Sequence, residues 1–261
     1  MATLGWMTPV LLAFDTSTEA LAVALQGPAG RRQVFNGEGG ALASVRVLPV
    51  VQGLLNEAGV GLEGVDAIAF GRGPGAFTGL RTACAVAQGL AFGADKPVLP
   101  IDSLLIVAED ERVRLGEPAR LEVAVAMDAR MGELYAACYR WEASRWHDLL
   151  TPGLWAPQAW WQALQAVERP AGSGGATPLR TWAGSGLKWL AEAVPLGDQG
   201  LSLDLAQAPA DCANRAAALL RLAEQAWHAG RAVPAEQALP VYLRDKVALT
   251  TAERLALKER P

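Results

Sequence analysis

The hydroxyl-rich segment that follows the first apolar run is the first candidate for chemistry. Asp15, Thr16, Ser17 and Thr18 come directly after the apolar run 10–14. Hydroxyls and backbone N–H groups in such a turn can hold a phosphate, and a carboxylate can hold its cation. The same residue types are also typical of an Asx or ST turn that only closes a hairpin. On this segment alone, the turn is the favoured interpretation.

A glycine-rich loop further along the chain opens a helix. It consists of Gly73, Pro74, Gly75, Ala76, Phe77, Thr78 and Gly79. Glycines allow the backbone to approach a ligand closely, and the N-terminus of a helix favours an anion. The loop lacks the lysine of a P-loop, and it lacks the GxGxxG pattern with the acidic residue that a dinucleotide ribose needs. An anion site and a strained turn that only shapes the surface are therefore equally supported.

A second acidic residue, Asp128, also follows an apolar run. Arg130 and Glu133 come shortly after it. The segment could act as a second phosphate-like loop, but a structural pair between an aspartate and an arginine is the favoured interpretation. Because Asp15 and Asp128 occupy similar places after apolar runs, they hint at a duplicated architecture.

Histidine and cysteine are too sparse for a familiar metal site. The chain contains His147, His228, Cys84, Cys138 and Cys212. A zinc or iron site needs several such ligands at short spacing, so we expect no metal and no disulfide framework. Neither histidine lies beside a loop suited to a Ser-His-Asp triad. Ser17 and Ser103 are therefore interpreted as a turn residue and a helix cap.

Apolar runs separated by turn residues predict a meander followed by alternating helices and strands. The expected strands cover residues 10–14, 20–25, 32–35, 65–70 and 98–101, and the expected helices cover 44–59, 78–92 and 103–113. The order is three strands, then helix, strand, helix, strand and helix. This is the order of a ribonuclease H-like α/β unit.

The pattern starts again at residue 121. A strand over 121–127 and a hairpin over 134–141 and 146–150 precede a long helix over 211–230. We expect a first lobe over 1–108, a second over 109–210, a helix over 211–232 that packs back on the first lobe, and a tail over 233–261 that docks through 240–244. Residues 170–178 are expected to form a flexible loop. Eight of the nine tryptophans lie at or after Trp141, which indicates a second core of different composition.

The composition narrows the class of protein. The chain has 261 residues, 51% hydrophobic and 19% charged, with a formal net charge of -4. This content supports a sizeable core and excludes disorder as the dominant state. The acidic balance argues against a protein that grips nucleic acid alone through a broad basic face. Without a signal-peptide pattern or a run long enough to span a membrane, we expect a cytoplasmic protein.

Four blocks of the sequence closely resemble the TsaB (YeaZ) family. They are residues 12–19, residues 73–81 together with 87–90, residues 127–133 and residues 240–244. The match runs in order from Leu11 to about Arg244, and the GPGxFTGxR block is specific. The tryptophan-rich stretch from Trp141 to Leu205 shows no recognisable motif.

The resemblance implies an α/β, actin-like and Hsp70-like (ASKHA) fold of two ribonuclease H-like lobes. It implies a non-catalytic scaffold in the bacterial synthesis of N6-threonylcarbamoyladenosine (t6A37) in tRNAs that read ANN codons. In that pathway TsaC makes threonylcarbamoyl-AMP, and TsaD transfers the group to adenosine with the help of TsaB and the ATPase TsaE. The implied partners are TsaD and TsaE. The implied protein is a homodimer in isolation, reaches tRNA only through the complex, and needs no cofactor and no membrane.

One departure from the catalytic relatives favours the scaffold. TsaD-like catalysts hold a metal through an HxxxH pair on an early helix, but residues 42–46 contain no histidine, and Ala43 stands where many relatives keep one. The loops at Asp15 and Asp128 are then vestigial, and we expect Asp15→Asn to cost about 1 kcal/mol of stability or less. Two alternatives stay open. One is an ATP-binding ASKHA phosphotransferase that uses both aspartates, and the other is a glycoprotease-like metallopeptidase.

The helix over 78–92 is apolar all round, which predicts that both of its faces are buried. One face should pack on its own sheet. The opposite face is small and uncharged, and it predicts a partner interface shared by the homodimer and the TsaD heterodimer. Its residues are Thr82, Ala85, Val86 and Gly89, extended by Val47, Val50, Val51 and Leu54 of the preceding helix. The alternative is that the helix over 211–230 covers this face.

Overall fold

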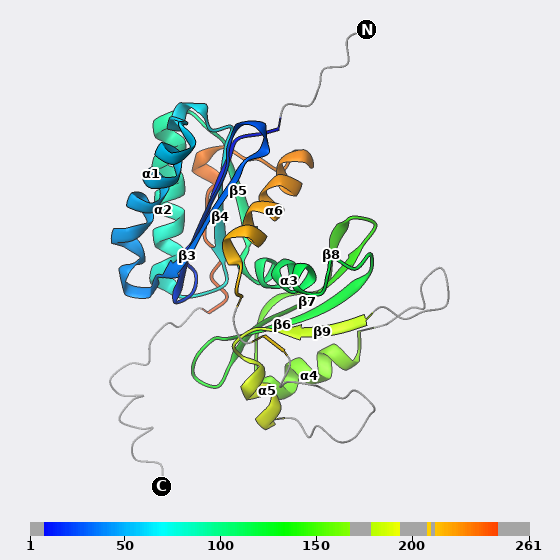
Figure 1. The fold of residues 1–261 in the computed structure, drawn as a ribbon. Coiled ribbons are helices and arrows are strands. Elements are labelled where there is room, and N and C mark those ends of the chain that lie inside the picture. The colour runs from blue at the N-terminus through cyan, green and yellow to red at the C-terminus, as the bar shows by residue number, and fades with distance from the viewer. Residues whose placement is uncertain (1–7, 168–178, 194–207, 210–211, 245–261) are drawn as a thin grey trace, which may run out of the picture.

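The computed structural model describes residues 8–167, 179–193, 208–209 and 212–244, which form two α/β lobes (Figure 1). The strands of the first lobe are β1 (Leu11–Asp15), β2 (Ala20–Gln26), β3 (Arg32–Glu38), β4 (Ala67–Gly73) and β5 (Val98–Asp102). They form one sheet in the order β3-β2-β1-β4-β5. β1 pairs antiparallel with β2 and parallel with β4, as in the ribonuclease H-like unit that the sequence predicts.

Helices cover both faces of this sheet (Figure 1). α1 (Ala43–Ala58) and α2 (Phe77–Ala94) pack on one face, where Leu12 and Phe14 supply bulky side chains. α6 (Arg215–His228) packs on the other face. Successive strand residues point to opposite faces, so this second face of β1, β2 and β4 presents mainly alanines. Small side chains let α6 approach the sheet closely.

The second lobe repeats the topology of the first. Its strands are β6 (Leu121–Asp128), β7 (Leu134–Glu142), β8 (Arg145–Trp155) and β9 (Leu179–Ala183). Their order, β8-β7-β6-β9, matches β3-β2-β1-β4, with antiparallel pairs followed by one parallel pair. The duplicated two-lobe α/β fold predicted from the two strand-ending aspartates is therefore present.

Three helices complete the second lobe. α4 (Pro157–Gln165) and α5 (Leu187–Ala193) cover the outer face of its sheet, and α3 (Ser103–Arg114) packs on the inner face, between the two sheets (Figure 1). β9, α4 and α5 were not expected from the sequence. These elements are short, and β9 lacks a regular alternation of buried and exposed residues. The boundary placed between residues 108 and 109 falls inside α3.

The position of α3 forces its charged side chains to pair inside the protein. Glu109 is fully buried, and Arg112 donates to both of its carboxylate oxygens at 3.0 and 2.8 Å. The indole N–H of Trp146, from β8, donates to Glu109 at 2.9 Å. A buried carboxylate needs such partners because it has lost its hydration. The Arg112 bonds lie within α3, and the Trp146 bond joins α3 to the second lobe.

Two expectations concern residues outside the part of the chain that the structure describes. They are the loop over 170–178 and the portion of the tail after residue 244. Within the described helices, none combines the length and the hydrophobicity of a membrane-spanning segment.

Candidate functional site

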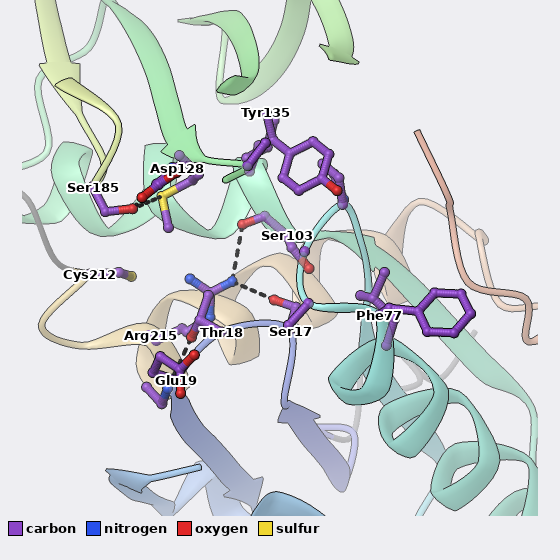
Figure 2. Close-up of a pocket in the computed structure, with 18 of the residues that line it drawn as sticks. Ser17, Thr18, Glu19, Phe77, Ser103, Asp128, Tyr135, Ser185, Cys212 and Arg215 are labelled. Carbon is purple, nitrogen blue, oxygen red and sulfur yellow. Dashed lines mark hydrogen bonds between the residues drawn. The ribbon is translucent and has the colours of Figure 1, made fainter. Parts of the chain in front are cut away.

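A cleft of about 780 Å³ opens between the lobes, near the carboxyl ends of β1 and β6 (Figure 2). Both lobes contribute polar and aromatic side chains to its wall. Among them are Ser17, Thr18 and Phe77 from the first lobe and Asp128, Tyr135 and Ser185 from the second. In α/β proteins, a crevice at the carboxyl ends of strands is the usual place for a ligand. The cleft is therefore the candidate functional site.

Asp15 does not face this cleft as a free carboxylate. Its side chain is fully buried, and Arg215 at the start of α6 approaches Oδ2 with Nη2 at 2.6 Å and Nε at 2.7 Å. Ser17 donates its backbone N–H to Oδ1 at 2.7 Å and its hydroxyl to Oδ2 at 3.0 Å. Both carboxylate oxygens of Asp15 are thus bound by groups of the protein itself.

The same arginine ties three segments together. Besides Asp15, Nη2 of Arg215 donates to the hydroxyl of Ser17 at 3.0 Å and to the carbonyl of Ser103 at 3.4 Å, as Figure 2 shows. Burial by itself lowers the pKa of Arg215, but the charge and hydrogen bonds of Asp15 and Cys212 outweigh burial and raise it. The guanidinium is therefore charged, and a cation at Asp15 would have to compete with it.

Ser103 has a different role from the predicted helix cap. Asp102 is the N-cap residue of α3 and makes no side-chain capping bond, and Ser103 is the first helical residue. The Ser103 hydroxyl instead accepts the backbone N–H of Gly73 at 3.1 Å. The prediction of a cap was wrong because Ser103 serves a contact between elements that are distant in sequence.

The glycine-rich loop packs directly on the turn after β1. A Cβ atom at Gly79 would collide with the carbonyl of Thr16, and one at Gly75 would collide with the carbonyl of Ser17. The Thr16 hydroxyl donates to the Gly79 carbonyl at 2.7 Å, and the N–H of Ala76 donates to the Ser17 carbonyl at 2.8 Å. The two segments that the sequence separately offered as anion sites therefore bind each other.

The other residues of this loop line the cleft or lie at the start of α2. Pro74 is buried in the wall of the cleft, and Thr78 is exposed at the start of α2. The rings of Phe77 and Tyr242 pack at a tilt, with their centroids 5.1 Å apart, and the Arg81 guanidinium lies 3.8 Å from the Phe77 centroid.

The loop after β6 is held as an Asx turn. Oδ1 of Asp128 accepts the backbone N–H of Arg130 at 2.7 Å, and the Asp128 N–H donates to the Ser185 hydroxyl at 3.2 Å. The side chain of Arg130 lies 3.5 Å from Glu19 instead, and both are largely exposed. The pair of Asp128 and Arg130 that the sequence favoured is therefore a bond from the Arg130 backbone to the Asp128 side chain. The Arg130 guanidinium points across the mouth of the cleft toward Glu19.

The residues of the predicted interface fall into two groups. Val47 and Val51 are buried against the sheet in the first-lobe core, so their assignment to a partner surface is corrected here. The helical phase places them on the inner side of α1. The other predicted residues keep some exposure: Val50, Leu54, Thr82 and Val86 are half-buried, and Ala85 and Gly89 are exposed. The helix α6 packs on the opposite face of the sheet and does not cover them.

Sequence reasoning missed Arg215, whose guanidinium is the counter-charge of the buried Asp15. It also missed the exposed apolar residues Leu42, Val45, Leu48 and Phe92 around α1 and α2. A signal for Arg215 was present, because an arginine in the first turn of a helix opposes the helix dipole. Such a residue needs a nearby carboxylate, and that carboxylate lies 200 positions away in the sequence.

Comparisons with known proteins match this chain to TsaB proteins and to a TsaD family model. A family model described as "TsaD: tRNA N6-adenosine threonylcarbamoyltransferase" matches residues 41–251. The tRNA threonylcarbamoyladenosine biosynthesis protein TsaB of Escherichia coli K12 is 35% identical over 91% of this chain and 96% of its own length. The Haemophilus influenzae protein of the same name is 47% identical over 48% of this chain and 51% of its own length.

Solved structures give the same result for the fold. A structure described as YeaZ from Pseudomonas aeruginosa is 41% identical, with a TM-score of 0.71, over 90% of this chain and 100% of that chain. A second Pseudomonas aeruginosa structure, described as an uncharacterized protein with similarity to peptidase YeaZ, is 42% identical with a TM-score of 0.73 over the same shares.

We expect Arg215→Met to lower the free energy of unfolding by about 3–5 kcal/mol, because it leaves Asp15 buried without its counter-charge. Asp15→Asn should cost several kcal/mol, because it leaves the buried Arg215 without its counter-charge. This cost replaces the smaller one of about 1 kcal/mol or less that the sequence alone predicts. Arg221→Met is the matched control on the same helix. Arg221 pairs with Glu117 at 3.0 Å on the surface, so its loss should cost about 1 kcal/mol or less. Urea denaturation measures all three, and equal costs for Arg215 and Arg221 would contradict the assignment.

We expect Gly79→Ala to destabilise the protein by about 3 kcal/mol, since its Cβ would collide with the Thr16 backbone, which cannot swing aside as a flexible side chain can. Gly93→Ala is the control in the same helix. Nothing lies within 4 Å of a Cβ there, so alanine should stabilise by about 0.5–1 kcal/mol. Thermal unfolding of both variants tests this, and a neutral Gly79→Ala would show that the two segments are not in firm contact.

Proposed function

The chain belongs to the TsaB (YeaZ) family of tRNA threonylcarbamoyladenosine biosynthesis proteins, and from this premise we propose that it is a non-catalytic scaffold subunit of the complex that makes t6A37. In this proposal it pairs with TsaD, works with TsaE, and reaches tRNA only through the complex. Alone it forms a homodimer, and the setting is the cytoplasm.

One observation carries the non-catalytic part of the proposal, namely the buried pair of Asp15 and Arg215. A phosphotransferase of this architecture needs a strand-end carboxylate that can hold a metal ion or its water shell. Here both oxygens of that carboxylate are bound by protein donors, and a fixed positive charge lies 2.6 Å away. If a cation took the place of Arg215 beside Asp15, the buried guanidinium would lose its counter-charge. This arrangement supports a structural role for the strand end.

The outer surface of α1 and α2 supports the scaffold part. Several large apolar side chains lie exposed there: Leu42 at 50%, Val45 at 67%, Leu48 at 47% and Phe92 at 61%. The exposed small residues Ala85 and Gly89 lie on the same outward side of α2 and would let a partner helix approach closely. Apolar surface concentrated on one side of a molecule is typical of a protein interface. We assign this surface, from here on the α1/α2 surface, to TsaD and to a second copy of the chain. The two assemblies would then exclude each other.

Reconstitution tests the function. With TsaC, TsaD and TsaE homologues, ATP, threonine, bicarbonate and tRNA, we expect t6A to form only when this chain is added. The chain alone should modify no tRNA. Mass spectrometry of digested tRNA measures the product. Full product formation without this chain would contradict the scaffold role.

Ala85→Glu tests the α1/α2 surface. We expect the variant to fold normally, because Ala85 is exposed, and to lose at least about tenfold in affinity for TsaD and for itself, because a charge would be buried unpaired. Ala166→Glu is the control, since Ala166 is exposed on the second lobe. Val86 is a poorer probe because it packs partly against the core. Sedimentation and calorimetry give the affinities, and unchanged binding by Ala85→Glu would place the interface elsewhere.

A further inference from the structure

The last described residues of the chain run along the mouth of the cleft between the lobes. After α6 the chain pairs with β5 through Val233 and then packs beside α2, where Gln88 donates to the carbonyl of Ala238 at 2.9 Å. Residues 241–244 then line the cleft. We call residues 240–244 the strap.

The first half of the strap is bound to the first lobe. The N–H of Val241 donates to the carbonyl of Arg72, at the end of β4, at 2.7 Å. The ring of Tyr242 packs on Phe77, and the Arg81 Nε donates to the Tyr242 hydroxyl at 3.3 Å. A backbone bond and an aromatic contact thus hold the strap to the start of α2 and the end of β4.

The second half of the strap is bound to the second lobe through one side chain. Arg244 lies 2.6 Å from Glu133 and donates to the carbonyls of Ala129 at 3.0 Å and Arg130 at 3.3 Å. Its side chain is only 13% exposed, so these charge-assisted bonds are partly shielded from water. The loop that receives it contains three successive residues with positive φ, at positions 130, 131 and 132. That backbone turns its carbonyls toward the guanidinium.

We propose that the strap ties the two lobes together across the cleft and holds the cleft at a fixed width. Two-lobed α/β proteins commonly close and open by hinge motion around a crevice between their domains. Opening this cleft would have to separate Arg244 from the loop at 129–133 or peel Val241 and Tyr242 from the first lobe. The strap therefore makes the two lobes move as one body, and residues 240–244 act in positioning the lobes.

The native thiol of Cys212 provides a probe of cleft opening. Cys212 lines the cleft, and it contacts both the core beneath α6 and the core beside α3, so separation of the lobes would expose it (Figure 2). Cys138 is fully buried in the second-lobe core and reacts only when that core unfolds. The two thiols distinguish a movement of the lobes from unfolding of the chain.

The experiment measures alkylation of the full chain by N-ethylmaleimide under native conditions, with mass spectrometry at each cysteine. For Arg244→Ala we expect the rate at Cys212 to rise at least about tenfold, with Cys138 unreactive, because bonds to a charged group are lost from the closed state only. The rate for Arg244→Lys should lie between those of the wild type and Arg244→Ala, since lysine keeps the positive charge but lacks the branched guanidinium that donates to several acceptors at once. Arg145→Ala, at an exposed arginine of the second lobe, should match the wild type.

Two results of the alkylation experiment would overturn the proposal. One is an unchanged rate at Cys212 in Arg244→Ala. The other is reaction of Cys138 in step with Cys212, which would assign Arg244 to overall stability.

A distance measurement gives an independent check. Spin labels at Gln52→Cys and Gln162→Cys, both exposed and on different lobes, are placed in a background without the native cysteines. Arg244→Ala should broaden the distance distribution, and an identical distribution would also refute the strap.

Discussion

The buried ion pair between Arg215 and Asp15 is the interaction on which the arrangement around the cleft depends. It joins the first turn of α6 to the end of β1, and the same guanidinium reaches Ser17 and the start of α3. Neither charge can leave without stranding the other in a place that water does not reach. α6 is therefore fixed on the alanine-rich face of the sheet, and both carboxylate oxygens at the strand end are bound by protein donors.

Glycine makes this closure possible. At Gly71 a Cβ atom would collide with the Asp15 carboxylate, and at Gly79 it would collide with the Thr16 carbonyl. In an anion site, such glycines would leave space for a ligand to approach the backbone. Here the turn after β1 fills that space, and the hydroxyls of Thr16 and Ser17 and the N–H of Ser17 are bound within the protein. Segments that have the composition of a phosphate site thus form a contact between two loops.

The two lobes share a topology but keep their charges in different places. The first lobe has its buried pair at the cleft, whereas Glu122 at the centre of the second sheet is held by Arg140 at 2.7 Å and Arg180 at 2.9 Å. α3 adds buried acids between the sheets, where the Thr181 hydroxyl donates to Glu111 at 2.7 Å. Such internally satisfied charges rigidify a core. The large apolar side chains exposed on and beside α1 and α2 support the scaffold role that we propose.

The sequence by itself determined the family, the duplicated α/β order and the places of the elements in the first lobe, because apolar periodicity and turn residues are local properties. The loops that it singled out, at Asp15, Gly79 and Asp128, lie at or beside the cleft. It left open whether those loops bind an anion or form turns, and it assigned Val47 and Val51 to the wrong side of α1. Only the tertiary structure showed that the first two of these loops bind each other and that Val47 and Val51 face the core. The partner of Asp15 comes from a helix 200 residues away, and no local pattern states which distant charge will neutralise a buried one.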